Sequence, residues 1–176
     1  MALYFVTGNK GKFEEVNYFI PHIEQINIDL LEIQSLDPKE IIKAKLSEVS
    51  KNRSDQFIVE DSSFFIDGMN GLPGPLIKFF VETVGNAGLV TMAKSFGDMS
   101  AQAHVMIGYG DGHDVKFFEG IITGTIVDPQ GDKGFGWDPI FMPEGSEKTF
   151  GQMSLEEKSE YSMRFKAAEK LKNYLK

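Results

Sequence analysis

The chain has 176 residues, of which 41% are hydrophobic and 25% charged, and it contains no cysteine, which excludes disulfides, thiolate metal sites and a cysteine nucleophile. This length favours a single domain, residues 1–176, that is large enough to bury a core. The formal net charge of −8 argues against a protein that coats nucleic acid. No apolar run approaches the ~20 residues of a membrane span, and residues 1–6 lack the basic segment of a secretory signal. We therefore expect a cytoplasmic protein.

A polar, glycine-containing turn follows the first predicted strand, residues 3–6, and precedes an amphipathic helix. The turn consists of Thr7, Gly8, Asn9, Lys10, Gly11 and Lys12. Backbone N–H groups at a helix N-terminus point outward, and glycine lets a phosphate approach, so this arrangement outlines an anion site. The lysines add positive charge. An ordinary strand-to-helix turn with solvated lysines is the alternative.

Two ionisable side chains stand out in the next elements. Apolar residues at 26, 28 and 30 alternate and predict a second strand that ends near Glu32, on the same face as those residues. Asp37 then predicts the N-cap of a helix. Within that helix Lys45 falls inside the apolar arc. A lysine there either snorkels to solvent or reaches a site at the edge of the core.

The apolar run 57–59 is followed by two adjacent carboxylates, Glu60 and Asp61, and then by Ser62. The run predicts a buried strand that ends at these acids, and ligands of open α/β sheets bind at such strand ends. Adjacent residues of an extended chain point to opposite sides, so the two acids should have different roles. A carboxylate here can hold Mg²⁺ or accept a proton from water. A strand followed by a polar turn is the alternative.

The middle of the chain predicts helices at about 76–84 and 87–96 and strands at 103–109 and 115–127. The sequence Gly110-Asp111-Gly112-His113 between the two strands is typical of a hairpin turn.

A glycine-rich loop, residues 128–138, carries Phe135, Gly136, Trp137 and Asp138. Aromatic faces in such a loop suit stacking on a planar base, and Asp138 could accept hydrogen bonds from ring N–H groups. The alternative is a loop that its two aromatic side chains pin to the core. Further on, Arg164 falls within the apolar arc of the last predicted helix, where a guanidinium needs an anionic partner.

Together these motifs resemble the inosine triphosphate pyrophosphatase family, also called non-canonical purine nucleoside triphosphate pyrophosphatases. The matching segments follow the family's order and comprise residues 7–12 with 14–15, 32, 59–62, 71–75, 134–141, 158 and 162–164. The resemblance implies an elongated two-lobed α/β fold with a central mixed β-sheet flanked by helices and an active-site cleft between the lobes. It also implies a homodimer and Mg²⁺-dependent hydrolysis of a nucleoside triphosphate, such as ITP, dITP or XTP, to the monophosphate and pyrophosphate.

The resemblance also implies roles for individual residues. Asp61 matches the catalytic base and a metal ligand, and Glu32 matches the second metal-linked carboxylate. The first turn, Lys45 and Lys158 match phosphate contacts, and the residues around Trp137 and Arg164 match base contacts. The full set expected to bind substrate is Thr7, Gly8, Asn9, Lys10, Gly11, Lys12, Lys45, Ser62, Phe135, Gly136, Trp137, Asp138, Lys158, Met163 and Arg164.

One position departs from the family's pattern. Met163 stands where the family usually has histidine. A thioether cannot donate a hydrogen bond to the 6-oxo group that separates hypoxanthine and xanthine from adenine, and loss of such a donor can forfeit discrimination. The same chemistry with a shifted base preference is therefore the first alternative. A nucleotide-binding module without catalysis and an unrelated structural α/β domain are the others.

Overall fold

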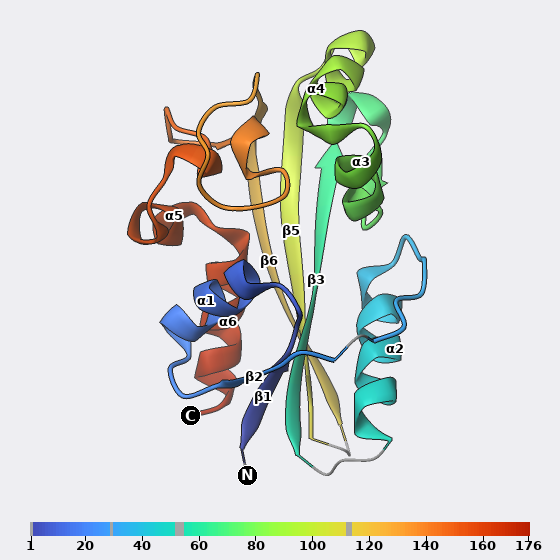
Figure 1. Cartoon of the computed structure of the whole chain (residues 1–176), viewed down its shortest axis with the longest axis vertical. Helices are drawn as coiled ribbons and strands as arrows, with labels where there is room; N and C mark the ends of the chain where they lie inside the picture. Colours follow the sequence, from blue (N-terminus) through green and yellow to red (C-terminus); the bar gives the residue numbers. More distant parts are fainter. Residues whose placement is uncertain (1, 29, 52–54, 112–113) are drawn as a thin grey trace. The chain divides into compact units, whose positions relative to one another are not determined.

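The computed structural model describes residues 2–28, 30–51, 55–111 and 114–176 (Figure 1). Its strands are β1 (Leu3–Val6), β2 (Glu24–Ile26), β3 (Gln56–Ile66), β4 (Pro73–Gly74), β5 (Ser100–Gly110), β6 (Val115–Ile126) and β7 (Phe141–Pro143). Within the described ranges they form one seven-stranded sheet in the order β2-β1-β3-β5-β6-β7, with β4 also paired to β3. Parallel and antiparallel pairs both occur.

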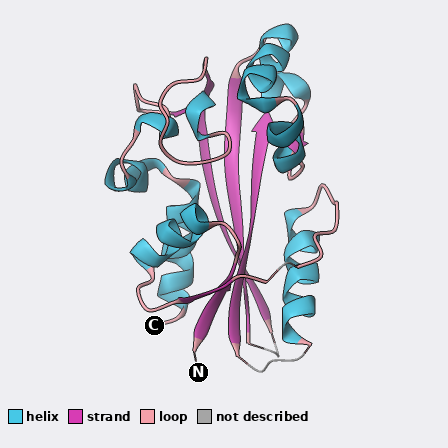
Figure 2. Cartoon of the chain, viewed as in Figure 1, coloured by secondary structure: helices cyan, strands magenta, loops and turns pink. Residues whose placement is uncertain are grey.

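The helices are α1 (Lys10–Phe19), α2 (Pro38–Ser50), α3 (Ile77–Thr83), α4 (Gly85–Phe96), α5 (Leu155–Tyr161) and α6 (Met163–Tyr174). Short 3₁₀ helices occur at η1 (Asp67–Met69), η2 (Asp138–Ile140) and η3 (Phe150–Gln152). Figure 2 shows the helices arranged around the strands. The expectation of an α/β fold with a central mixed sheet flanked by helices is confirmed.

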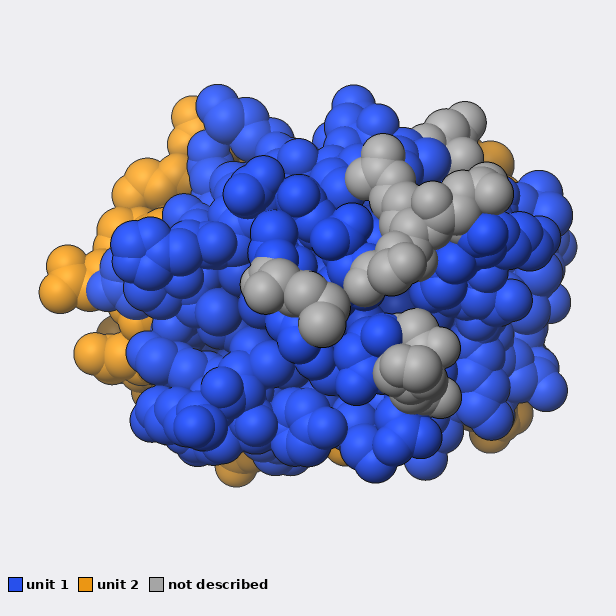
Figure 3. Space-filling model, turned by 90° about the horizontal axis from the view of Figure 1, so that it is seen from below, with its two compact units in different colours: residues 1–61, 105–120, 164–176 blue, residues 62–104, 121–163 orange. Residues whose placement is uncertain are grey.

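The chain forms two compact units, which Figure 3 colours separately. Unit 1 comprises residues 1–61, 105–120 and 164–176, and unit 2 comprises residues 62–104 and 121–163. The strands β3, β5 and β6 each contribute residues to both units. The single domain and the active-site cleft expected from the sequence stay predictions.

In unit 1, helices pack on both sides of the strands. β1 pairs in parallel with β2 and with β3. Figure 1 places α2 on one side of these strands and α1 with α6 on the other. The rings of Phe19 in α1 and Phe165 in α6 lie 4.6 Å apart between centroids. On the α2 side, the buried cluster consists of Val6, Ile42, Leu46, Val49, Phe57, Val59 and Met106.

The second strand was predicted in the wrong place. β2 ends at Ile26, and the described residues from 27 to 32 are not in a strand. Asp29, which the prediction included, lies outside the described residues. The side chains of Ile26, Ile28 and Leu30 nevertheless pack against the buried cluster of unit 1. Their alternation therefore reflects packing on the core and not a backbone ladder.

The strand that carries the paired acids is longer than predicted. β3 does not end at Glu60 and Asp61 but continues through them to Ile66. Both acids have ionic partners, so a strand can carry them in its middle. β5 and β6 confirm the two later strands, whereas Gly112 and His113 of the predicted hairpin turn lie outside the described residues.

Unit 2 has an aromatic core. β4 pairs with β3 and β7 pairs with β6, both antiparallel. The rings of Phe64, Trp137, Phe141 and Phe150 pack together with centroid separations between 4.6 and 6.3 Å. In neither unit is a described helix long and apolar enough to cross a membrane.

Candidate functional site

The polar turn after β1 closes onto the first turn of α1. Asn9 is the N-cap, and its Oδ1 accepts a hydrogen bond from the Lys12 N–H at 3.0 Å. Thr7 Oγ1 accepts one from the Asn9 N–H at 3.1 Å. A Cβ at Gly8 would come within 3.0 Å of Asn27 Oδ1, so a larger residue would crowd the turn. The first N–H groups of a helix have no partner within the helix, and here they lie beside Lys10 and Lys12, as an anion site requires.

A buried ionic cluster anchors this turn to β3 and α6. Arg164 donates from Nε and Nη2 to both oxygens of Glu60, at 2.7 and 3.0 Å, and from Nη1 to Glu15 at 2.6 Å. Lys12 Nζ lies 3.2 Å from Glu60 Oε1. Arg164, Glu60 and Glu15 are all buried. Two cations and two carboxylates therefore neutralise one another, which lets the interior hold the three buried charges of Arg164, Glu60 and Glu15.

The arginine of this cluster stays charged. Burial lowers the pKa of the Arg164 guanidinium, but the neighbouring carboxylates of Glu60 and Glu15 outweigh burial and raise the pKa well above its ordinary value. Removing one partner of a buried ion pair typically destabilises a protein by about 3–5 kcal/mol, because the other charge is left unpaired. Arg164 is thus an integral part of unit 1.

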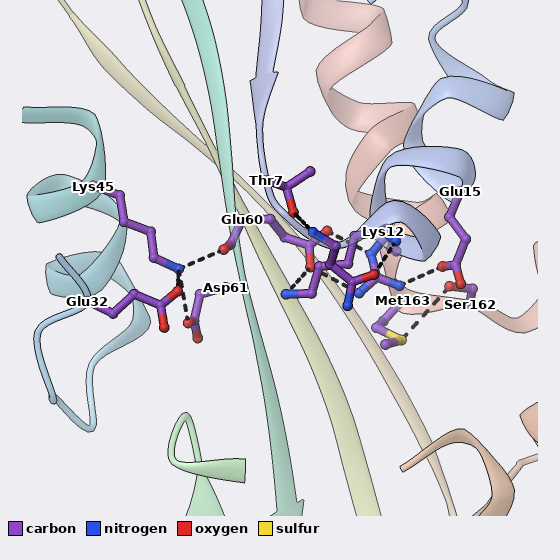
Figure 4. Close-up of polar contacts among 11 residues, drawn as sticks. Thr7, Lys12, Glu15, Glu32, Lys45, Glu60, Asp61, Ser162 and Met163 are labelled. Atoms are coloured by element: carbon purple, nitrogen blue, oxygen red, sulfur yellow. Dashed lines mark hydrogen bonds and ion pairs between the residues drawn. The ribbon is translucent and has the colours of Figure 1, made fainter. Parts of the chain in front are cut away.

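Asp61 faces the opposite side of β3 and meets a different cation. Lys45 Nζ lies 2.8 Å from Glu32 Oε1, 3.1 Å from the Glu60 carbonyl oxygen and 3.9 Å from Asp61 Oδ1. Figure 4 shows Glu32, Lys45 and Asp61 together on one side of the strand, and Lys12 and Glu15 on the other. The expectation that adjacent acids point to opposite sides holds, since Glu60 binds Arg164 on one side of the strand and Asp61 lies with Lys45 on the other (Figure 4).

The carboxyl of Asp61 has an unusual proton affinity. Burial raises its pKa, Lys45 and Lys12 lower it, and Glu60 and Glu32 raise it again, with the result that the pKa stands at about 6. The side chain retains 12% of its exposure. A carboxyl with a pKa this close to neutrality can take up a proton and return it to solvent, which is the property that a general base needs.

Glu32 and Asp61 could hold a divalent metal ion whose remaining ligands come from water and substrate. The described residues contain no group of three or more His, Cys, Asp or Glu side chains arranged to hold a metal ion. Mg²⁺ is usually bound through one or two carboxylates together with waters and substrate phosphates. Two carboxylates that share the ammonium of Lys45 match that donor set.

The glycine-rich loop of unit 2 is organised by Asp138. Its Oδ2 accepts hydrogen bonds from the Phe135 N–H at 2.9 Å and from Lys158 Nζ at 2.7 Å. Lys158 Nζ also lies 5.1 Å from the centre of the Phe135 ring and 4.9 Å from that of Phe150. Asp138 and Lys158 are both buried. In this arrangement Lys158 supports the loop, and its predicted phosphate contact stays a prediction.

The two aromatic residues of the loop differ. Trp137 is buried, and its ring stacks on Phe64 with centroids 4.6 Å apart, as the alternative of a loop pinned to the core describes. Phe135 is half-buried and keeps part of its ring accessible. Of the two, Phe135 is therefore better placed to stack on a base.

Met163 and its neighbour Ser162 are both buried, and Ser162 Oγ lies 3.9 Å from Met163 Sδ. The thioether has no hydrogen-bond donor of its own. Ser62 is half-buried on β3, next to Asp61.

The structure brings the predicted residues together in two groups, one in each unit. Unit 1 holds Thr7, Gly8, Asn9, Lys10, Gly11, Lys12, Glu32, Lys45, Asp61 and Arg164, and unit 2 holds Ser62, Phe135, Gly136, Trp137, Asp138, Lys158 and Met163. The sequence assigned no role to Glu15 or Glu60. The signal for Glu15 was its position four residues before Phe19, which puts an acid on the apolar face of α1.

Comparison with known proteins places the chain among relatives over almost its whole length. Residues 3–174 match the model of the Ham1 family. The chain belongs to the Ham1 family. It is 38% identical over 179 residues to an inosine triphosphate pyrophosphatase of Schizosaccharomyces pombe, covering 99% of this chain and 95% of that protein. It is 35% identical over 182 residues to a dITP/XTP pyrophosphatase of Methanopyrus kandleri, covering 100% and 97%.

Solved structures of Ham1 proteins share the fold. The Ham1 protein of Staphylococcus aureus superimposes with a TM-score of 0.79 at 25% identity, covering 98% of this chain and 97% of that one. The resemblance read from the motifs is thereby confirmed. In this Ham1-family chain the polar turn of residues 7–12, the side chains of Glu32, Lys45 and Asp61, and the glycine-rich loop all lie within the matched range.

Proposed function

We propose that this protein is a nucleoside triphosphate pyrophosphatase that hydrolyses ITP, dITP and XTP to the monophosphate and pyrophosphate. The names of its relatives support this substrate class. The observation that carries the proposal is the Asp61 carboxyl, whose pKa of about 6 makes it a base suited to neutral pH, beside Lys45 and Glu32. A structural carboxylate in an ordinary salt bridge would show the opposite pKa shift.

In the proposed reaction, Asp61 accepts a proton from a water molecule that attacks phosphorus in the α–β anhydride linkage. A new P–O bond forms, the bridging P–O bond breaks, and its electron pair leaves with pyrophosphate. Lys12, Lys45 and the N–H groups of the first turn of α1 stabilise the negative charge that develops. Lys10 is exposed and adds to the positive charge at the entrance to the turn.

Phosphoanhydride hydrolysis suggests a divalent metal, and we propose Mg²⁺, held by Glu32 and Asp61. When bound, the ion supplies positive charge that neutralises the triphosphate and orients it for in-line attack. Charge neutralisation at the site makes the overall net charge of −8 no obstacle to an anionic substrate.

A hydrolysis panel tests the proposal. ITP, XTP, dITP, dUTP, GTP and ATP are incubated with the protein and Mg²⁺, and pyrophosphate is measured separately from orthophosphate. Pyrophosphate released chiefly from ITP, XTP and dITP is the expected result. Orthophosphate alone would overturn the reaction type, and tight binding of Mg²⁺ and ITP without turnover would indicate a nucleotide-binding module.

Met163 motivates a second candidate, the same reaction with a broader or shifted base preference. The buried thioether offers no hydrogen bond to a 6-oxo group. In the panel, pyrophosphate from GTP, ATP or dUTP at rates close to that from ITP would favour this candidate. Met163→His should then raise the preference for ITP and XTP, provided that Met163 contacts the base.

We also propose that the protein is a homodimer and that it is located in the cytoplasm, as expected from the sequence. Light scattering of the purified protein would give the mass of the assembly, and twice the 19.7 kDa of one chain is the expected value. A monomer at micromolar concentration would contradict it. Fluorescence microscopy of a tagged chain would test the location.

A further inference from the structure

The glycine-rich loop of unit 2 is fixed firmly at its ends and lightly at its centre. Asp138 and Lys158 hold residue 135, and the Trp137 ring is held in the aromatic core. Between them, Gly136 is exposed, has φ of +62°, and has no neighbour within 4 Å of the position that a Cβ would take. Glycine can adopt many other backbone conformations, so the centre of the loop needs a contact from outside the loop to keep this one.

Asn86, the second residue of α4, provides that contact. Its Nδ2 donates to the Gly136 carbonyl oxygen at 3.0 Å, across 50 residues of sequence. This bond fixes the orientation of the amide, because the reverse orientation would place two carbonyl oxygens against each other. The other end of the amide, Oδ1, is buried and finds no hydrogen-bond donor in the described part of the chain.

A buried carbonyl oxygen without a hydrogen-bond donor is unfavourable for folding. Asn86 therefore makes one useful hydrogen bond and leaves one polar atom unsatisfied. Its net contribution to folding is small, and a purely structural role explains it poorly. Groups of this kind in native structures call for a functional explanation.

We propose that Asn86 is a positioning residue for base recognition: it holds the Gly136 carbonyl and thereby sets the place of Phe135 and Trp137. This inference rests on the proposed function, in which the loop contacts the base. Phe135, the better placed of the two aromatic residues to stack on a base, precedes Gly136, and Trp137 follows it, so a shift of the Gly136 peptide unit moves both neighbours. Asn86 reaches the substrate only through the loop and leaves the phosphate-binding groups of unit 1 untouched.

The variant Asn86→Ala tests the proposal, with Lys94→Met as the matched control. Lys94 is on the same helix and also ties α4 to the loop, but at its first residue, Asp128, through an exposed ion pair at 2.7 Å. Removing the Asn86 hydrogen bond should raise KM for ITP roughly three- to tenfold. The ITP-to-GTP ratio of kcat/KM should fall, whereas inhibition by inorganic tripolyphosphate, which has no base, should not change.

Trp137 gives a readout that does not depend on catalysis, because it is the only tryptophan of the chain and follows Gly136. In Asn86→Ala its emission should shift to longer wavelength and become more sensitive to acrylamide. The midpoint of thermal unfolding should change little, because the unsatisfied Oδ1 disappears together with the hydrogen bond. Lys94→Met should resemble the wild type in all of these measurements.

Several results would overturn the proposal. An unchanged base ratio with unchanged Trp137 quenching would do so, as would the same changes in Lys94→Met. A lower unfolding midpoint with an unchanged base ratio would assign Asn86 a structural role only. If the wild type releases no pyrophosphate from any nucleotide, the proposed function fails. Unchanged Trp137 quenching in Asn86→Ala would then show that Asn86 does not position the loop either. If Asn86→Ala does not fold, the same measurements are made on Asn86→Ser.

Discussion

Asp61 combines two properties that oppose each other. Burial raises its pKa to about 6, which suits a base, while the nearby lysines favour the ionised form that a metal needs. Glu60, its neighbour in sequence, instead forms ion pairs with Arg164 and Lys12. The direction in which each side chain leaves β3 therefore decides which acid is available for chemistry.

Replacing Asp61 should separate binding from turnover. In Asp61→Asn we expect kcat for ITP to fall by about 10²–10⁴-fold, the usual contribution of a general base, while the dissociation constant for ITP changes only a few-fold. Glu32→Gln is the comparison, since a lost metal ligand without a lost base should be partly rescued by higher Mg²⁺. Wild-type turnover in Asp61→Asn would show that another group is the base.

The same residue makes the stability of the metal-free protein depend on pH. The carboxyl has an ordinary pKa of 3.8 and a pKa of about 6 in the folded chain. Between these values the folded state binds the proton that the unfolded state releases, so stability falls as pH rises through this window. The loss reaches on the order of 3 kcal/mol above pH 6, because each pKa unit corresponds to about 1.4 kcal/mol.

Denaturant unfolding in EDTA tests this sign. At pH 7.5 Asp61→Asn should be more stable than the wild type, and at pH 4 the two should converge. Adding Mg²⁺ should stabilise the wild type more than the variant, because the cation favours the ionised carboxylate. The opposite result would be a free energy of unfolding that increases with pH in the wild type relative to Asp61→Asn, measured in EDTA. It would show that the Asp61 carboxylate is better solvated or better paired than the structure indicates.

At the scale of elements, one side chain joins three segments that are distant in sequence. Arg164 at the start of α6 binds Glu60 of β3 and Glu15 of α1, across 104 and 149 residues. The segment that supplies the anion-binding turn is thereby connected to the strand that carries Asp61. Lys12 takes part through the same carboxylate.

Arg164→Met should destabilise the protein by about 3–5 kcal/mol, because it leaves the carboxylates of Glu60 and Glu15 buried without their main partner. Urea unfolding measures the difference. The triple variant with Glu60→Gln and Glu15→Gln should recover a large part of the loss, since no carboxylate is then left unpaired. If the triple variant is less stable than Arg164→Met alone, hydrogen-bond geometry and not charge accounts for the cluster.

Local signals predicted the elements whose ends are determined locally. Asp37 caps α2 as expected, and its Oδ1 accepts a hydrogen bond from the Lys39 N–H. The predicted length of β3 was too short because two adjacent acids are typical of the end of a buried strand. In the structure Arg164 pairs with Glu60 and Lys45 with Asp61, so the strand continues past them. Such tertiary partners have no local signature. The site residues that the motif set implies stay predictions, and the contact of Asn86 with the loop could not be read from the sequence.

At the scale of the whole molecule, the two units share their backbone. β3, β5 and β6 each run from one unit into the other. A strand cannot lose half of its ladder without exposing the backbone groups of the rest. We therefore expect residues 1–176 to unfold in one cooperative transition, as a single domain does.

Arg164→Met provides the test, because Arg164 belongs to unit 1 and Trp137 to unit 2. A loss of 3–5 kcal/mol corresponds to a decrease in Tm on the order of 10 °C for a chain of this size. In one cooperative transition, Trp137 fluorescence and far-UV circular dichroism should give the same lowered midpoint. If the dichroism midpoint falls while that of Trp137 stays at the wild-type value, the units unfold separately, and unit 2 keeps its aromatic core after the anion-binding turn of unit 1 is lost.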